Sequence, residues 1–324
     1  MPSDKPSDAF QEKIPIELWY GARKHPMQQA GAGTPPNLPA GTQGTGMKIA
    51  IQGEPGSFSH EAALNLVADA VIVPFSLSAE AFAAVSNGSV AAAVIPIENS
   101  LAGSVSEHFD LLLTHDVVVE RETLLRIRHN LIAISGSSVG EIDRVFSHPV
   151  ALAQCRHFLA AHPRMESYAF YDTAGSVKQL VELRDRHAAA IASEAAAHFY
   201  GAQILQSGIE DNPENFTRFF LVRRTGEAIA DPQANKVSVA FSVENRPGSL
   251  VSALSELSSL GTNLTKIESR PVHGKPWEYI FYVDCQINSP EEGTRALVAL
   301  RPHCSMVKEL GRYREASRIA QSRS

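Results

Sequence analysis

Residues 48–60, KIAIQGEPGSFSH, place a short apolar run directly before a turn rich in glycine and serine, and a helical pattern follows from Ser59 to Ala70. Short apolar runs are typical of buried strands, and glycine and serine are typical of the turns that end them. The same order recurs further along the chain, which indicates alternating strands and helices around a largely parallel sheet. The recurrences are 91–97 before 104–115, 144–146 before 149–161, and 188–192 before 194–200.

Small polar residues mark the start of each predicted helix. In α/β sheets, ligands bind outside the carboxyl ends of the strands, where helix N-termini offer free N–H groups and a positive dipole end. Each start alone is typical of an ordinary helix cap, but together they predict a pocket for a small molecule that bears carboxylates. The stretches are 53–60, 96–104 with a capping-box spacing between Ser104 and Glu107, 147–149 with a proline at the first helical position, and 172–175 with a capping side chain at its start.

The run 215–221, NFTRFFL, follows a turn-forming segment and has the aromatic and aliphatic character of a strand that enters a core. Side chains alternate along a strand, so Asn215, Thr217 and Phe219 share one face and Arg218 points to the other. One face would then combine an amide, a hydroxyl and an aromatic wall. Threonine and phenylalanine are also common in strands without any chemical role, so the heptapeptide alone leaves both interpretations open.

The chain of 324 residues is longer than one ordinary domain, and its composition, 44% hydrophobic and 20% charged, is that of a globular protein. A net charge of −6 argues against broad attraction to nucleic acid or to an anionic membrane, so local donors must hold any carboxylate ligand. No apolar run has the length of a membrane span. Cys155, Cys285 and Cys304 show no metal-ligand spacing, which favours a reduced, cytoplasmic protein without a structural metal.

A second module follows a linker at residues 227–235. Its predicted elements follow the order strand, helix, strand, strand, helix, strand, which is the order of a ferredoxin-like module. Residues 1–46 lack hydrophobic periodicity and predict a flexible extension, and the polar tail 314–324 is expected to fray. The elements of the second module are 236–243, 250–260, 263–272, 277–287, 290–300 and 306–313.

Several ordered motifs make residues 47 to about 313 resemble a prephenate dehydratase that carries a C-terminal ACT regulatory domain. The resemblance covers all of the chain except its first 46 residues, and the combination is more specific than any single motif. The matching motifs are 53–60, 96–100, 147–149, 151–155, 172–174 and 217–219 in the first part and 245–250 and 268–271 in the second.

The resemblance implies an α/β catalytic region over 47–226, folded as two lobes in the manner of type II periplasmic binding proteins. The chain would cross near residue 127 and return near residue 213, so that one lobe holds 47–126 with 213–226 and the other holds 127–212. The linker would span 227–235, and a ferredoxin-like ACT domain would span 236–313.

The resemblance also implies the reaction. Prephenate would lose carbon dioxide and hydroxide to give phenylpyruvate, a lyase step in phenylalanine biosynthesis that needs no cofactor and no metal. The threonine of the family's Thr-Arg-Phe motif falls on Thr217, which would donate a proton to the departing hydroxide. Ser57 replaces a more usual threonine, and Val150 replaces a common glutamine, which puts that polar contact in doubt. The expected substrate-binding residues are Ser57, Glu98, Asn99, Ser100, Ser147, Gln154, Thr173, Arg218 and Phe219.

The ACT domain of such proteins binds phenylalanine at a subunit interface, so the resemblance implies phenylalanine as an effector. A plain dimerisation module of the same topology is the alternative. Either way a homodimer or homotetramer is expected, because a small module that exposes a sheet edge tends to pair. The expected effector-binding residues are Asn245, Pro247, Gly248, Ser249, Leu250, Glu268, Ser269, Arg270 and Pro271.

Two other functions stay open at this point. Arogenate dehydratase is the nearer one, because arogenate differs from prephenate only by an amino group in place of the side-chain ketone. A solute-binding or sensor protein would use the same cleft without turnover, but it would not need the proton donor at Thr217. Covalent serine chemistry is disfavoured because the chain has no G-x-S-x-G elbow.

Overall fold

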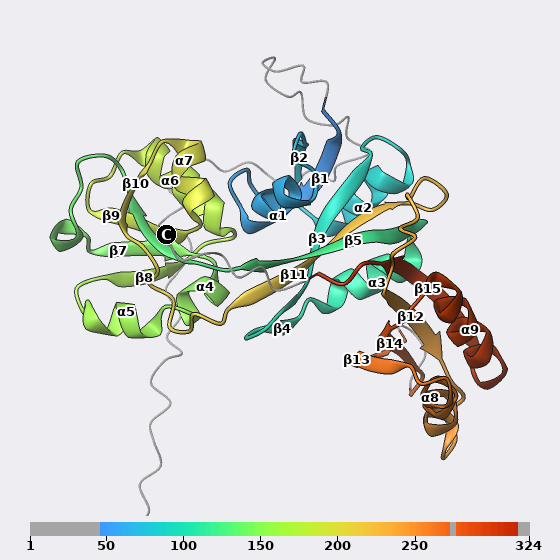
Figure 1. Cartoon of the computed structure of the whole chain (residues 1–324). Coiled ribbons are helices and arrows are strands. Elements are labelled where there is room, and N and C mark those ends of the chain that lie inside the picture. Colours follow the sequence, from blue (N-terminus) through green and yellow to red (C-terminus); the bar gives the residue numbers. More distant parts are fainter. Residues whose placement is uncertain (1–45, 273–276, 317–324) are drawn as a thin grey trace, which may run out of the picture. The chain divides into compact units, whose positions relative to one another are not determined.

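The computed structural model describes residues 46–272 and 277–316, so the interpretations of 1–45 and of 317–324 lie outside the described residues. Two sheets organise this part of the chain (Figure 1). Their alternation of strands and helices confirms the α/β class that the sequence pattern predicted.

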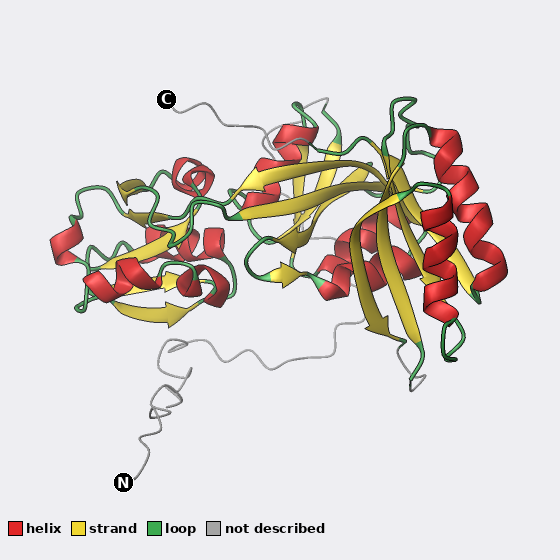
Figure 2. Cartoon of the chain, turned by 60° about the horizontal axis from the view of Figure 1, so that its bottom comes forward, coloured by secondary structure: helices red, strands yellow, loops and turns green. Residues whose placement is uncertain are grey.

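The first sheet is mixed, which corrects the expectation of a largely parallel one. Near one edge, strand β1 (Lys48–Gln52) pairs in parallel with β2 (Val71–Phe75) and β3 (Ala92–Asn99). Strand β11 (Phe216–Arg224) then pairs antiparallel with both β3 and β5 (Val117–Arg126), because it returns from the second sheet. Figures 1 and 2 show β5 and β11 side by side. The remaining elements are α1 (Phe58–Leu66), α2 (Ser78–Ser86), β4 (Gly103–Ser104) and α3 (Ser106–Thr114).

The second sheet has the strand order β10-β6-β9-β7-β8 and hydrophobic clusters on two sides. Its central strand β9 (Ala188–Ala192) is buried at every position, as its run of small apolar residues predicts. The other elements are β6 (Asn130–Ala133), η2 (Val139–Glu141), β7 (Arg144–Ser147), α4 (Pro149–Ala153), α5 (Arg156–Ala161), β8 (Glu166–Ala169), α6 (Thr173–Leu183), α7 (Glu194–Tyr200) and β10 (Gln203–Gln206).

Most of the predicted helix starts are present, but two predictions were wrong. Asp172 caps α6, and Pro149 opens α4. The capping box at Ser104 does not form, because Ser104 pairs with Glu98 in the β3–β4 ladder and α3 begins two residues later. The predicted helix over 149–161 is divided into α4 and α5, because the Asp211 carboxylate accepts the first two N–H groups of α5 and starts a new helix there.

The C-terminal module has the predicted order of elements. Helices α8 and α9 pack on one face of a four-stranded antiparallel sheet, ordered β13-β14-β12-β15. Gly261 follows the end of α8 with a positive φ, as its predicted role as a helix stop requires. The elements are β12 (Lys236–Ser242), α8 (Ser249–Ser259), β13 (Asn263–Pro271), β14 (Tyr279–Gln286), α9 (Pro290–Leu300), η3 (Arg301–His303) and β15 (Met306–Tyr313).

Strand β15 also pairs with β5, so this module continues the first sheet. The pairing joins Gly311 to Val119. A Cβ on Gly311 would lie 2.3 Å from the Val119 carbonyl oxygen, so a residue with a side chain would push the two strands apart. The junction between the two modules therefore depends on a glycine.

Candidate active site

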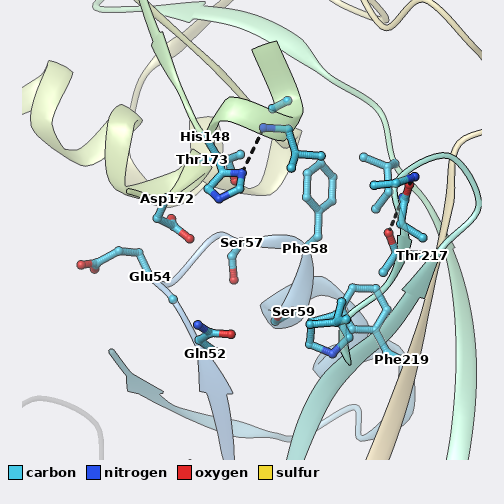
Figure 3. A pocket seen from close by; sticks show the side chains of 18 of the residues that line it. Gln52, Glu54, Ser57, Phe58, Ser59, His148, Asp172, Thr173, Thr217 and Phe219 are labelled. Carbon is cyan, nitrogen blue, oxygen red and sulfur yellow. Dashed lines mark hydrogen bonds between the residues drawn. The ribbon is translucent and has the colours of Figure 1, made fainter. Parts of the chain in front are cut away.

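A cavity of about 870 Å³ lies between helix N-termini that follow strands of the first sheet and helix N-termini that follow strands of the second sheet (Figure 3). The ends of β1 and β3, the start of α1 and strand β11 line it from the first sheet, and the starts of α4 and α6 line it from the second. This is the kind of site that the sequence predicted from its helix starts. Six of the expected substrate-binding and catalytic residues line the cavity: Ser57, Asn99, Gln154, Thr173, Thr217 and Phe219.

Thr217 and Asn99 face each other across neighbouring strands. The Asn99 amide nitrogen Nδ2 donates to Thr217 Oγ1 at 2.9 Å. The Asn99 oxygen Oδ1 accepts from the backbone N–H groups of Leu101 and Ala102, at 3.0 and 2.8 Å, which fixes the orientation of the amide. Because the Thr217 oxygen accepts this hydrogen bond, its own proton is free to be donated to a group in the cavity.

A chain of hydrogen bonds extends from this pair to the second lobe. Asn215 accepts from Asn99 Nδ2 at 2.7 Å and donates through its own Nδ2 to Gln154 Oε1 at 2.9 Å. His129 Nε2 lies 2.9 Å from the same Gln154 oxygen. Burial lowers the pKa of His129 and so favours the neutral ring. Because Gln154 presents an oxygen to it, His129 Nε2 carries the ring proton and donates to that oxygen.

Sequence reasoning did not include Asn215 and His129 among the site residues. The alternation along 215–221 placed Asn215 on the same face as Thr217, which was the available signal. His129 follows no helix start, and only the fold brings it to the cavity. Its ring packs edge-on against Phe58, with the ring centroids 5.7 Å apart.

Glu54 and Asp172 lie on the side of the cavity away from Thr217 (Figure 3). Within the described residues the lining also includes Glu107 but no lysine and no arginine, although Lys178 lies 3.1 Å from Glu54 behind it. Asp172 accepts from the Gly175 N–H at 2.7 Å, and burial, with a further contribution from Glu54, raises the pKa of its carboxyl group. The donors that the described lining can offer to an anion are therefore hydroxyl, amide, imidazole and helix-start N–H groups.

The turn before α1 is where the two lobes touch. Ser193 donates to the Gly56 carbonyl oxygen, and Tyr171 donates to Glu54 at 2.9 Å. Gly56 has a φ of 86°, and a Cβ there would lie 2.7 Å from the Cα of Ala196. A residue with a side chain at position 56 would therefore be strained and would also separate the lobes.

Three of the other expected substrate-binding residues lie outside the cavity lining. Ser147 is fully buried and donates to the Ile191 carbonyl at 2.6 Å, so it ties β7 to β9, and its neighbour His148 lines the cavity instead. Ser100 is exposed and donates to the backbone of Glu214. Glu98 alternates away from Asn99 and forms an ion pair, which places its carboxylate on another surface.

Arg218 is the clearest correction to the expected site. It points away from the cavity, as strand alternation indicates, and is 8% exposed. Its guanidinium lies 2.6 Å from Glu122, donates to Asp284 and donates to Tyr313 Oη at 2.9 Å. Lys236 adds a second cation 3.0 Å from Glu122. Arg218 therefore joins the catalytic strand to the C-terminal module and does not contact a ligand in the cavity.

The two expected effector motifs lie at one end of the C-terminal sheet. Ser242, the last residue of β12, pairs with Ile280, which pairs in turn with Arg270 on β13. The loop 245–250 therefore leaves the sheet at the end where residues 268–271 lie. Within this loop Asn245, Pro247 and Gly248 are exposed, and Ser249 and Leu250 are half-buried.

The four residues of the second effector motif, 268–271, lie in two different environments on β13. Ser269 and Pro271 are exposed, whereas Glu268 and Arg270 face the catalytic module. This differs from the expectation that all four residues contact an effector. The contacts with the catalytic module are Lys266 with Glu98 at 3.0 Å, Glu268 with Ser104, and Arg270 Nε with Asp110 at 3.0 Å.

A two-lobed α/β unit that encloses a polar cavity, followed by a ferredoxin-like module, defines a small-molecule-binding protein with an attached regulatory-type domain. Residues 49–227 match the family model of prephenate dehydratase, and residues 237–302 match that of the ACT domain. The chain belongs to the prephenate dehydratase family.

Relatives carry both dehydratase names. Arogenate dehydratase 2 of Petunia hybrida is 35% identical over 94% of this chain and 84% of its own length. The bifunctional chorismate mutase/prephenate dehydratase of Aquifex aeolicus is 35% identical over 83% of this chain and 74% of its own length.

Solved structures share the fold. Prephenate dehydratase from Arthrobacter aurescens, determined in complex with L-Phe, is 32% identical with a TM-score of 0.76, over 83% of this chain and 90% of that one. A structure described as GqqA, a novel type of quorum quenching acylase, is 32% identical with a TM-score of 0.77, over 84% of this chain and 98% of that one. Among the described residues, no helix has the length and apolar character of a membrane span.

Proposed function

We propose that this protein is a lyase that converts prephenate to phenylpyruvate, carbon dioxide and water. The observation that carries the proposal is the hydrogen bond from Asn99 to Thr217, which leaves the threonine proton available inside the cavity at the family's motif. The three cysteines are free, as in a reducing compartment, and the cytoplasm is the proposed location.

The chemistry requires orientation and one proton. The bond between the ring and its carboxylate breaks, and its electron pair enters the ring, which becomes aromatic as the C4–O bond breaks. The Thr217 hydroxyl gives its proton to the departing oxygen, so that water leaves and solvent later returns a proton to Thr217. General acid assistance of this kind is worth about 10²–10⁴ in rate. Phe219 adds an aromatic wall to the same side of the cavity.

Arogenate is the second candidate substrate, and the acidic side of the cavity favours it. Arogenate carries an ammonium group, so its net charge is less negative than that of prephenate. Glu54 is paired with Lys178 at 3.1 Å, so Asp172 is the acidic group that would repel a ligand carboxylate and attract this ammonium group. The protein is therefore proposed to accept both acids.

Parallel assays of the two substrates test the function. Phenylpyruvate formed from prephenate and phenylalanine formed from arogenate are measured with the same enzyme preparation. For Asp172→Asn, which keeps a capping side chain on α6, we expect the ratio of kcat/KM for arogenate to kcat/KM for prephenate to fall about tenfold, because a charged contact is lost.

Asp69→Asn removes an equal charge from an exposed residue and serves as the control. It should leave the ratio unchanged. Failure of the wild-type protein to convert either substrate would remove the proposed function. An unchanged ratio for Asp172→Asn would remove only the role of Asp172 in substrate preference.

Phenylalanine is the proposed effector, bound to the ACT domain of a homodimer or homotetramer. Strand β13 is an edge strand of its sheet, and Ile267 on it is 50% exposed, which suits pairing with a second copy. Strand β13 also contacts the catalytic module, because Glu268 binds Ser104 on β4 and Arg270 pairs with Asp110 on α3. Ser104 and Glu107, which belong to β4 and α3, line the cavity. Contacts made by β13 therefore reach the cavity wall directly.

Calorimetric titration with phenylalanine tests this regulatory role. We expect saturable binding heat and a change in dehydratase rate over the same concentration range. Asp110→Asn weakens the ion pair between α3 and Arg270, so it should reduce the change in rate several-fold while binding heat persists. An absence of heat at millimolar phenylalanine would contradict the regulatory role.

A further inference from the structure

Asn215 occupies a central position that no substrate contact explains. Its side chain is fully buried, and it does not line the cavity. It lies in the segment just before β11, where the chain returns from the second sheet to the first. Both of its side-chain hydrogen bonds go to cavity residues, one on each side of this crossing: Asn99 on β3 and Gln154 at the end of α4.

The direction of every hydrogen bond in this group is determined. Backbone N–H groups occupy Asn99 Oδ1, so Asn99 must present its nitrogen to Asn215. Asn215 then accepts through Oδ1, and its nitrogen must donate to Gln154. Gln154 Oε1 is thereby committed to Asn215 and His129. The Gln154 nitrogen Nε2 is left as the end of the amide that can donate to a ligand.

We infer that Asn215 is a positioning residue that sets the orientation of the Gln154 amide, so that a donor faces the ligand's carboxylate. The inference rests on the proposed function, since it assumes a carboxylate ligand. A flipped Gln154 would turn its oxygen toward that carboxylate and repel it. Because the cavity lining has no lysine and no arginine among the described residues, each amide donor contributes strongly to anion binding.

Asn215→Asp tests the hydrogen bond to Gln154 apart from the hydrogen bond to Asn99. An aspartate oxygen still accepts from Asn99, so the orientation of Thr217 is kept and kcat should stay within about threefold. An ionised aspartate cannot donate to Gln154 and repels its oxygen, so the amide turns its nitrogen toward residue 215. Neutral His129 permits this turn by carrying its proton on Nδ1, so that Nε2 accepts from the turned amide. We expect KM for prephenate, and the Kd for phenylpyruvate measured by calorimetry, to rise about tenfold at pH 8.

The pH dependence supplies a further readout. A buried carboxyl group has a raised pKa, so the introduced aspartate becomes protonated as pH falls. The acid form donates through its O–H and accepts through its carbonyl, as asparagine does. The defect in KM should therefore shrink between pH 8 and pH 5.5 in the variant, whereas the wild-type protein shows no such recovery.

Asn130→Asp is the matched control. Asn130 is 3% exposed and donates to the Ala192 carbonyl at 3.2 Å, but it does not line the cavity. Its variant should lose stability without a change in Kd or in the pH profile. A Kd and pH profile for Asn215→Asp equal to those of wild type would overturn the inference.

Asn215→Ser gives a second test if the aspartate variant does not fold. The serine side chain is too short to bond both Asn99 and Gln154, and it introduces no charge. KM should therefore rise and kcat should fall together. Wild-type values of both would overturn the inference. The Kd for phenylpyruvate keeps this test separate from the proposed function, because binding is measured whether or not prephenate is converted.

Discussion

Replacing Thr217 with valine should lower kcat for prephenate by about 10²–10⁴, the usual contribution of a positioned general acid. Valine has nearly the shape of threonine and suits a strand, so the fold and the cavity wall should be kept. The loss should appear in kcat, with substrate affinity changed little, because the proton is transferred only as the C4–O bond breaks. Steady-state kinetics of phenylpyruvate formation, with prephenate binding measured by calorimetry, provide the readout.

Thr217→Ser is the matched control for this prediction. Serine keeps a hydroxyl that can accept from Asn99 and donate to the leaving oxygen, so it should retain most of the rate. Near-normal turnover by Thr217→Val with unchanged affinity would contradict the role of Thr217 as proton donor.

Replacing Arg218 with methionine should destabilise the protein by about 3–5 kcal/mol, the usual cost of removing one partner from a buried ion pair. Glu122 and Asp284 would lose the guanidinium that lies between them, although Lys236 and Ser238 remain as partners. Urea unfolding of the full chain, followed by circular dichroism, measures the change.

Arg121→Met provides the comparison for this effect. Arg121 is on the neighbouring strand β5, and its side chain is 52% exposed, so its loss should cost less than about 0.5 kcal/mol. Equal stability losses for the two arginine variants would show that the buried group does not join the modules as described.

Local patterns were sufficient for much of the fold. The alternation of strands and helices, the proline at the start of α4 and the glycine after α8 act through near neighbours in sequence, and the structure has each of them. The failed capping box at Ser104 shows the limit of such patterns. Ser104 is engaged by Glu268, 164 residues away, so a tertiary contact competes with the local cap.

The site was predictable in part for the same reason. Helix starts and strand alternation located Ser57, Thr173 and Thr217 on the cavity. Alternation also put Arg218 on the far face, yet family resemblance suggested a substrate contact for it. Its partners Glu122 and Asp284 are 96 and 66 residues away, so its role in joining the modules emerges only from the folded chain.

Crystals of the Thr217→Val protein with prephenate bound would test the central claim most directly. The slow variant preserves the substrate during data collection. The account predicts that the C4 hydroxyl lies within about 3.5 Å of the Asn99 amide nitrogen and against residue 217. A substrate whose C4 hydroxyl faces Asp172, on the acidic side of the cavity, would contradict it.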